Sequence, residues 1–176
     1  MLRVCLICLT LLLIPLKSLA ATAHGYLGVF GGEVSVDGMD TKKAEPLTYT
    51  LGYRLSSFWA FQMEYTEAKP FRGMVMNSDK ETPCDMAYTA SGAYLMVIHP
   101  MGSWLDFNMK YGYVELDYSF DDPSVLDSTK ERYSYSGKAY GGGITLKMSS
   151  ALVFTVDYTQ LRDDASQLSA GIELDL

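Results

Sequence analysis

Cysteine, histidine and long apolar runs are scarce in this sequence. Three cysteines and two histidines occur in 176 residues. Two of the cysteines, Cys5 and Cys8, fall at the beginning of the chain, so Cys84 has no cysteine partner in the remainder and an intramolecular disulfide is excluded there. No spacing of His24 or His99 with Cys, Asp or Glu is typical of a metal site or a His-activated nucleophile. We therefore expect no catalytic residues, no metal and no cofactor.

The beginning of the chain has the pattern of a secretory signal peptide. Arg3 precedes an uncharged apolar run over residues 4–16, and small residues come before a cut after Ala20. A transmembrane helix is the alternative, but it needs about 20 apolar residues, and this run is shorter and contains Pro15. A cut after Ala23 is a second possibility. We predict a cleaved signal peptide over residues 1–20 and one domain over residues 21–176.

The charge of the remainder limits its partners. Without Arg3 and Lys17 the chain keeps 12 basic against 21 acidic residues, a net charge of −9, which argues against binding nucleic acid. No later apolar stretch is long enough for a membrane helix. If this protein lies in a membrane, it must therefore cross with strands.

Strict alternation of apolar and polar residues dominates the rest of the sequence. Residues 47–55 place Leu or Tyr at every second position, and after Ser56-Ser57 the apolar parity resumes over residues 59–65. The same pattern surrounds two more tight turns, at residues 99–102 and 147–150. A period of two indicates strands, and short turns between such strands indicate β-hairpins.

Longer polar stretches separate these hairpins, at residues 35–45, 67–86, 119–133 and 161–165. With a first strand at about 24–34 and a last one at 166–176, the count reaches eight. Short turns that alternate with long loops are typical of outer-membrane barrels, where the turns face the periplasm and the loops face outward. We predict an all-β fold, an eight-stranded antiparallel up-and-down transmembrane β-barrel. The register of the strand at 87–98 stays open because both of its parities are apolar, and that of the first strand is open as well.

A soluble lipocalin is the alternative eight-stranded barrel, and it keeps an apolar pocket inside. Here the polar parity carries small residues and charges of both signs, which would line such a pocket poorly. The other parity is large, aromatic and uncharged, and it would form an apolar patch that soluble monomers rarely expose. We therefore expect the apolar parity to face lipid. The predicted lumenal charges, which should pair because an unpaired buried charge is unfavourable, are Arg54, Glu64, Asp106, Lys110, Asp157 and Glu173.

Aromatic residues gather near the expected strand ends. Trp59 and Trp104 stand beside tight turns, and the tyrosines toward the opposite ends are Tyr65, Tyr111, Tyr113, Tyr118, Tyr133, Tyr135 and Tyr158. Two aromatic belts mark the two interfaces of a membrane. The preference of aromatic residues for strands is the alternative explanation, but it accounts for their number and not for their placement.

Two stretches resemble a known family. Residues 51–65 look like the Gly-Tyr-Arg hairpin, with a Glu on the following strand, of the outer-membrane β-barrel domain proteins. These are often labelled porin-like and include the membrane domain of outer membrane protein A. Gly171, Leu174 and Leu176 resemble the C-terminal signal that the barrel-assembly machinery reads, although that family commonly ends in Phe. The resemblance implies an outer-membrane location, a lumen plugged by salt bridges, and the lipid bilayer, lipopolysaccharide and the assembly machinery as partners.

These features favour a structural and surface-interaction role, with an unknown ligand of the outer loops. A narrow channel for ions or small solutes is the alternative, which is disfavoured because eight strands leave room for little besides side chains. An outer-membrane lipid-modifying enzyme is a third possibility, and no placed nucleophile and base support it. The paired carboxylates Asp121-Asp122 and Asp163-Asp164 are expected to be solvated loop residues, and Gly141-Gly142-Gly143 is expected where strands pack closely.

Overall fold

A computed structural model describes residues 23–36, 39–40, 44–77, 80–120 and 132–176. The predicted signal peptide and the pair Asp121-Asp122 lie outside these residues. No helix in the described part of the chain is long and apolar enough to cross a membrane.

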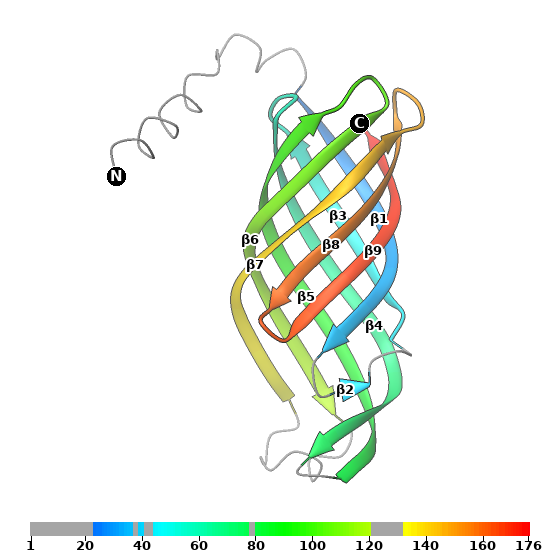
Figure 1. The fold of residues 1–176 in the computed structure, drawn as a ribbon, viewed down its shortest axis with the longest axis vertical. Helices are drawn as coiled ribbons and strands as arrows, with labels where there is room; N and C mark the ends of the chain where they lie inside the picture. Colours follow the sequence, from blue (N-terminus) through cyan, green and yellow to red (C-terminus); the bar gives the residue numbers. More distant parts are fainter. Residues whose placement is uncertain (1–22, 37–38, 41–43, 78–79, 121–131) are drawn as a thin grey trace, which may run out of the picture.

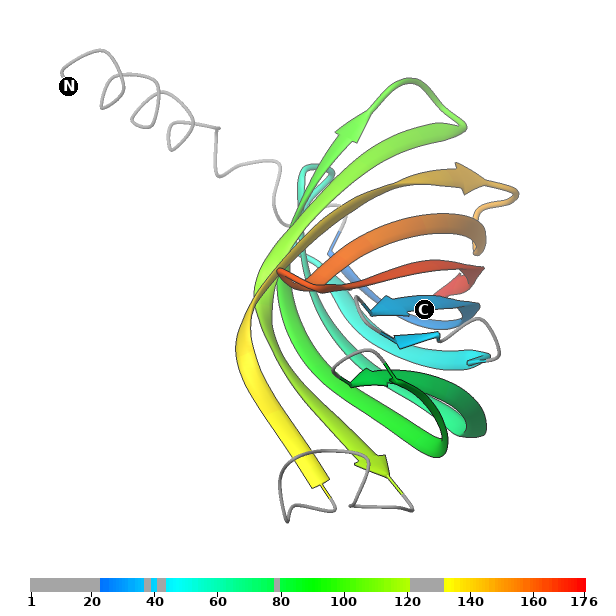
Figure 2. The same cartoon turned by 60° about the horizontal axis from the view of Figure 1, so that its bottom comes forward.

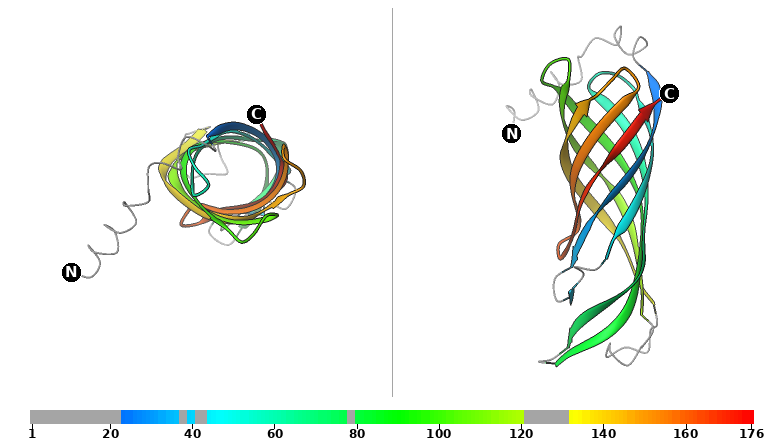
Figure 3. Two further views of the ribbon diagram at one scale, coloured as in Figure 1. Left: turned by 90° about the horizontal axis from the view of Figure 1, so that it is seen from above. Right: turned by 90° about the vertical axis from the view of Figure 1, so that its right-hand side faces the viewer.

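One closed antiparallel sheet makes up the described chain. Its order is β2-β1-β3-β4-β5-β6-β7-β8-β9, and pairing of β1 with β9 closes the ring, as the end-on view shows (Figure 3). The strands are β1 (His24–Val36), β2 (Met39–Asp40), β3 (Pro46–Arg54), β4 (Trp59–Asn77), β5 (Lys80–Pro100), β6 (Leu105–Phe120), β7 (Arg132–Lys147), β8 (Leu152–Arg162) and β9 (Ala165–Asp175). The predicted barrel of eight strands is confirmed, with β2 as a short addition that pairs with β1 and β4.

The two ends of the barrel differ (Figure 1). At one end three tight turns join β3 to β4, β5 to β6 and β7 to β8; we call it the tight-turn end. At the other, the hairpin end, β4 to β7 continue well beyond the turn that joins β8 to β9 (Figures 1 and 2). That turn is only Asp163-Asp164, since Arg162 already pairs with Ala165.

The prediction of a loop over residues 67–86 is wrong. β4 and β5 stay paired from Phe71 with Met86 to Asn77 with Lys80, after a bulge between Ala68 and Phe71. Pro70 falls in that bulge, where its missing N–H breaks no ladder bond. Polar composition suggested a loop, but pairing with a neighbouring strand satisfies the backbone of a polar segment just as well.

The other predicted loops also begin later than expected. β1 runs to Val36 and β6 runs to Phe120, so both strands enter the stretches at 35–45 and 119–133. β8 extends through Leu161 and Arg162. Residues 121–131 of the third loop lie outside the described residues.

Side chains alternate between the lumen and the outside as the sequence pattern requires. β3 has alternating buried and exposed residues from Pro46 to Tyr53, and the open registers are now determined. In β5, Tyr88, Tyr94 and Ile98 point inward, while Leu95 and Val97 are exposed. A one-residue slip would have reversed every one of these positions.

Candidate functional site

A charged group lies at the centre of the lumen. Lys110 on β6 donates a hydrogen bond of 2.6 Å to Glu64 on β4, and its Nζ lies 3.7 Å from Asp157 Oδ2 on β8. Lys110 is only 4% exposed and Asp157 only 3%. The Lys110 ammonium also lies 5.0 Å from the centre of the Tyr94 ring. One cation thus bridges two carboxylates from opposite walls of the barrel, which compensates their loss of hydration.

The absence of a side chain at Gly143 allows the Asp157 carboxylate to reach Lys110. Asp157 pairs with Gly143 on β7, and β7 lies between β8 and β6. A Cβ at Gly143 would lie 1.9 Å from Asp157 Oδ1 and 2.3 Å from the carbonyl oxygen of Val156. The glycine run predicted to mark close strand packing therefore has a defined role, because it leaves the space through which the Asp157 carboxylate crosses β7.

Uncharged polar groups extend the network to β1. Tyr26 donates a hydrogen bond of 2.7 Å to Gln62 Oε1, and Gln62 donates one of 2.6 Å to Glu64. On the far side, Asn108 donates a hydrogen bond of 3.2 Å to Thr145. The hydrogen bonds and ion pairs from Tyr26 to Asp157 thus link β1, β4, β6 and β8, and such buried networks rigidify the packing that they join.

A second ionic group lies nearer the tight-turn end. Asp106 is buried, and its carboxylate lies 2.7 Å from Lys147 Nζ and 3.6 Å from Arg54. Lys147 also belongs to this ionic group, although the sequence pattern assigned it to a turn and so did not predict it. Glu173 is buried as well, and it forms no ion pair with another described residue. Of the six predicted lumenal charges, Glu64, Lys110 and Asp157 thus form the central group and Arg54 and Asp106 belong to the second, while Glu173 joins neither.

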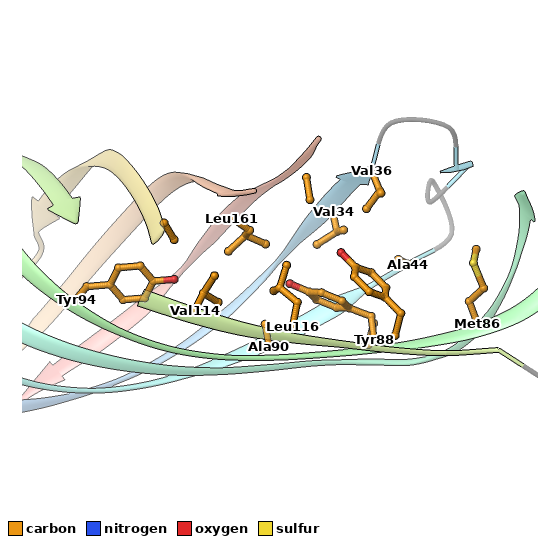
Figure 4. Close-up of a cluster of buried hydrophobic side chains, with 14 residues drawn as sticks. Val34, Val36, Ala44, Met86, Tyr88, Ala90, Tyr94, Val114, Leu116 and Leu161 are labelled. Carbon is orange, nitrogen blue, oxygen red and sulfur yellow. The ribbon is translucent and has the colours of Figure 1, made fainter. Parts of the chain in front are cut away.

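The lumen toward the hairpin end holds a large apolar cluster, which corrects the expectation of a polar interior throughout (Figure 4). A buried polar set lies beside it, in which Thr48 is hydrogen-bonded to Thr66 at 2.8 Å and to Gln167 at 2.9 Å. Tyr88 and Tyr118 lie with ring centres 5.3 Å apart. The apolar cluster consists of Val34, Val36, Ala44, Ala68, Met86, Tyr88, Ala90, Tyr94, Val114, Leu116, Tyr118, Ala139, Leu161 and Ala165. These residues continue the lumenal parity beyond the charged group and pack against one another.

The outer surface carries an apolar band with a sharp edge. On β6 the outward residues are apolar up to Tyr113 and then become Glu115 and Asp117; on β4 they are apolar up to Tyr65 and then become Glu67. Of the other aromatic residues predicted at the interfaces, Trp104, Tyr111 and Tyr158 are exposed and Trp59 is half-buried.

Two of the predicted interface tyrosines do not face outward. Tyr118 is buried inside the barrel, and Tyr135 is half-buried against the apolar cluster. Both lie on the inward parity of strands that continue past the membrane band. The structure does not describe the side chains of Tyr133 and Cys84.

The predicted assembly-signal residues lie in β9 and directly after it. Leu174 and Leu176 are exposed on the outside of the barrel. Gly171 pairs with Phe30, and a Cβ there would lie 2.2 Å from the carbonyl oxygen of Val29. This glycine lets the last strand approach the first closely where the barrel closes.

The histidines and carboxylates form no reactive site among the described residues. His24 Nε2 lies 3.3 Å from Asp175 at the seam between β1 and β9, and His99 is exposed beside a tight turn. Asp164 pairs with Arg162 at 2.8 Å. Within the described ranges, no group of three or more His, Cys, Asp and Glu side chains is arranged to hold a metal ion.

β7 has a free edge at the hairpin end. Its residues from Tyr140 to Leu146 pair with both β6 and β8, but β8 ends too early to reach the residues before Tyr140. Among the described residues, Arg132 to Ala139 pair with β6 alone. Beyond the band, β4 to β7 therefore form an open sheet with β2 against one edge and β7 as the other (Figures 2 and 3).

Comparison with known proteins shows which solved structures share this architecture. No family model and no curated protein matches the sequence. Among solved structures, the attachment invasion locus protein Ail of Yersinia pestis is similar with a TM-score of 0.58 and 16% identity, over 88% of this chain and 97% of Ail. Neisserial surface protein A aligns with a TM-score of 0.58 and 13% identity, over 86% of this chain and 96% of that protein. The fold is that of the small outer-membrane β-barrels.

A third structure agrees: OprG of Pseudomonas aeruginosa aligns with a TM-score of 0.56 and 13% identity, over 88% of this chain and 94% of OprG. Together with the apolar outer band, this fold places the protein in the outer membrane, across the lipid bilayer. In such barrels the tight turns face the periplasm and the long hairpins face outward. The tight-turn end is therefore called periplasmic below, and the hairpin end extracellular.

Proposed function

We propose that the protein is a non-enzymatic surface-interaction barrel whose docking element is the free edge of β7. A strand edge carries a row of backbone donors and acceptors without strand partners and readily adds an extended peptide. The edge of β7 from Arg132 to Ala139 lies on the extracellular side of the apolar band. Ail is the attachment invasion locus protein of Yersinia pestis, and the shared fold supports a related surface role here.

The register shows which residues present their backbone at this edge. Lys147 donates its N–H to Trp104, on the β6 side. Because alternate residues of an antiparallel strand bond to opposite sides, Ser134, Ser136 and Lys138 direct their N–H and C=O groups away from β6. Their side chains point outward and are exposed, so the approach along this edge is lined by small or flexible groups. We propose an extended peptide as the ligand.

The filled lumen supports this role over that of a channel. Lys110, Glu64 and Asp157 lie across the centre, and the apolar cluster occupies the extracellular half together with Thr48, Thr66 and Gln167. We expect two successive layers of buried side chains to hinder the passage of a hydrated ion. We propose that the salt bridges plug the lumen and that the barrel does not conduct.

Two further partners belong to this proposal. Lipopolysaccharide would surround the extracellular rim of the band, near Tyr65 and Tyr113. The barrel-assembly machinery would read Gly171, Leu174 and Leu176, because two exposed apolar side chains lie at the end of the strand that closes the barrel.

A variant that lacks one backbone N–H group tests the docking edge. Ser136→Pro removes one free-edge donor and leaves the bonds between β6 and β7 intact, because edge strands tolerate proline. Ser136→Ala is the matched control, since it keeps the N–H. Cells that produce the proline variant should lose adhesion and serum survival, whereas cells with the alanine variant should behave as wild type. Equal adhesion and survival of all three strains, at equal amounts of folded barrel, would contradict a docking role for this edge.

A further inference from the structure

Two carboxylates lie one strand away from the free edge of β7. Glu115 and Asp117 on β6 pair with Ser136 and Ser134, two serines whose backbone groups face the edge. Because paired residues of neighbouring strands point to the same face of a sheet, all four side chains lie on the outer face. Glu115 is exposed and Asp117 is partly exposed. Negative charge therefore borders the edge on this face.

No described cation neutralises these two carboxylates. Neither Glu115 nor Asp117 forms an ion pair with another described residue. Asp117 instead accepts a hydrogen bond from Ser134 Oγ, which holds its carboxylate toward β7. Lys138 is exposed at the same edge, but it pairs with Tyr113 and lies nearer the membrane. A cation supplied by a ligand can therefore bind here without displacing an existing ion pair.

The serines leave room for such a cation to reach across β7. Neighbouring strands lie about 4.8 Å apart, so a strand added to the edge would lie about 10 Å from β6. Lysine and arginine carry their charge at the end of a long apolar stem. This stem can lie over the small Ser134 or Ser136 and bring the charge to Asp117 or Glu115. Lysine or arginine is therefore favoured opposite each serine, at every second position of the ligand.

The inner face of the edge has the opposite preference. Tyr135 and Gly137 lie on this face, where a Cβ at Gly137 would clash with the Tyr135 hydroxyl. Tyr135 packs against the apolar cluster, and the Arg162 guanidinium lies 5.0 Å from the centre of its ring. A ligand residue that points inward therefore meets apolar groups and a cation. Uncharged residues are favoured at these positions, because like charges on adjacent strands are destabilising.

We infer that the β7 edge binds a basic extended peptide in which lysine or arginine alternates with uncharged residues. Binding of this kind rests on the docking role proposed above for the edge. The backbone groups of the edge supply affinity, and the side chains beside it supply specificity. The formal net charge of −7 over the whole chain also favours the approach of a basic ligand.

Labelled synthetic peptides test this chemistry. The probe has lysine at alternate positions, separated by valine or threonine. It is compared with an isomer in which the lysines are adjacent and with a version in which glutamate replaces them. Fluorescence anisotropy measures their binding to the barrel in nanodiscs of phosphatidylcholine, a lipid without net charge. The alternating basic peptide should bind most tightly. No binding of this peptide, or equal binding of either other peptide, would overturn the inference.

Two double variants test the carboxylates themselves. Glu115→Gln with Asp117→Asn should weaken binding of the alternating basic peptide about threefold to tenfold at low salt, because each exposed ion pair contributes little. Glu33→Gln with Glu67→Gln is the matched control, since it removes the same charge from exposed residues of β1 and β4. This control should bind as wild type. If the two double variants bind equally, the carboxylates do not select the ligand and the inference is wrong.

Ser136→Pro separates this result from the proposed function. If the proline variant loses peptide binding while Glu115→Gln with Asp117→Asn leaves it unchanged, the edge docks peptides without selecting basic ones. In that case only the inference fails. If the proline variant binds the basic peptide as tightly as wild type and Ser136→Ala, the edge is not the docking element. The proposed function and the inference then fail together.

Discussion

Removing the cation at the centre of the lumen is the sharpest test of how this barrel is stabilised. In the wild-type protein, Lys110 Nζ lies 2.6 Å from a Glu64 oxygen and 3.7 Å from an Asp157 oxygen. Lys110→Met keeps most of the side-chain volume but leaves the two carboxylates without this cation. Breaking a buried ion pair by removing one partner typically costs about 3 to 5 kcal/mol. Because each 1.4 kcal/mol is about a factor of ten, the folding constant should fall at least a hundredfold.

Urea unfolding followed by tryptophan fluorescence in vesicles measures this change. Lys147→Met is the matched control: Lys147 also pairs with a buried carboxylate, Asp106, but its own side chain is partly exposed, so water replaces much of what is lost. The control should shift the unfolding midpoint far less than Lys110→Met.

A compensating variant separates unpaired charge from lost packing. Lys110→Met combined with Glu64→Gln and Asp157→Asn removes all three charges and should recover much of the stability, because the penalty comes from the unpaired carboxylates. In planar bilayers, the single variant should either be unstable or leak cations. If Lys110→Met unfolds at the wild-type urea concentration and conducts no better, the central ion group contributes little and the reasoning is refuted.

Three more results are expected. Gly143→Ala should lower stability by about 1 to 3 kcal/mol by overpacking, because its Cβ would lie 1.9 Å from Asp157 Oδ1; an unchanged urea midpoint would contradict this. Leu174→Asp with Leu176→Asp should block assembly but not export, as seen in cell fractions, and normal amounts of folded double variant in the outer membrane would speak against it. The wild-type barrel should migrate differently on gels before and after boiling, since a closed ladder has no edge within the bilayer to fray; identical migration would argue against closure.

The alternation of residue types was enough to predict the barrel and the parity of most strands. Over residues 47–66 only one assignment buries Thr48, Thr50 and Gln62 and exposes the large apolar residues, and the structure has that assignment. The same parity predicted that Glu64, Lys110 and Asp157 share one lumen. Period-two alternation carries this information because a strand offers only two faces.

The residues at which each strand begins and ends could not be predicted in the same way. Residues 67–86 have loop-like composition, yet β4 and β5 remain paired through them, because a strand continues wherever a neighbour satisfies its backbone. Whether a neighbour is present depends on the lengths of other hairpins, which lie far away in the sequence. The free edge of β7 likewise exists only because β8 ends at Arg162.

The sequence by itself determined the strand count, the lipid-facing parity and the inward parity of six charged residues, since each of these follows from local periodicity and residue type. The tertiary structure alone decided that Lys147 pairs with Asp106, that Asp157 crosses β7 above Gly143, and that an apolar cluster lies in the extracellular half of the lumen. These outcomes depend on the register and stagger with which the ring closes. Closure joins β1 to β9 from opposite ends of the chain, a relation that no local pattern encodes.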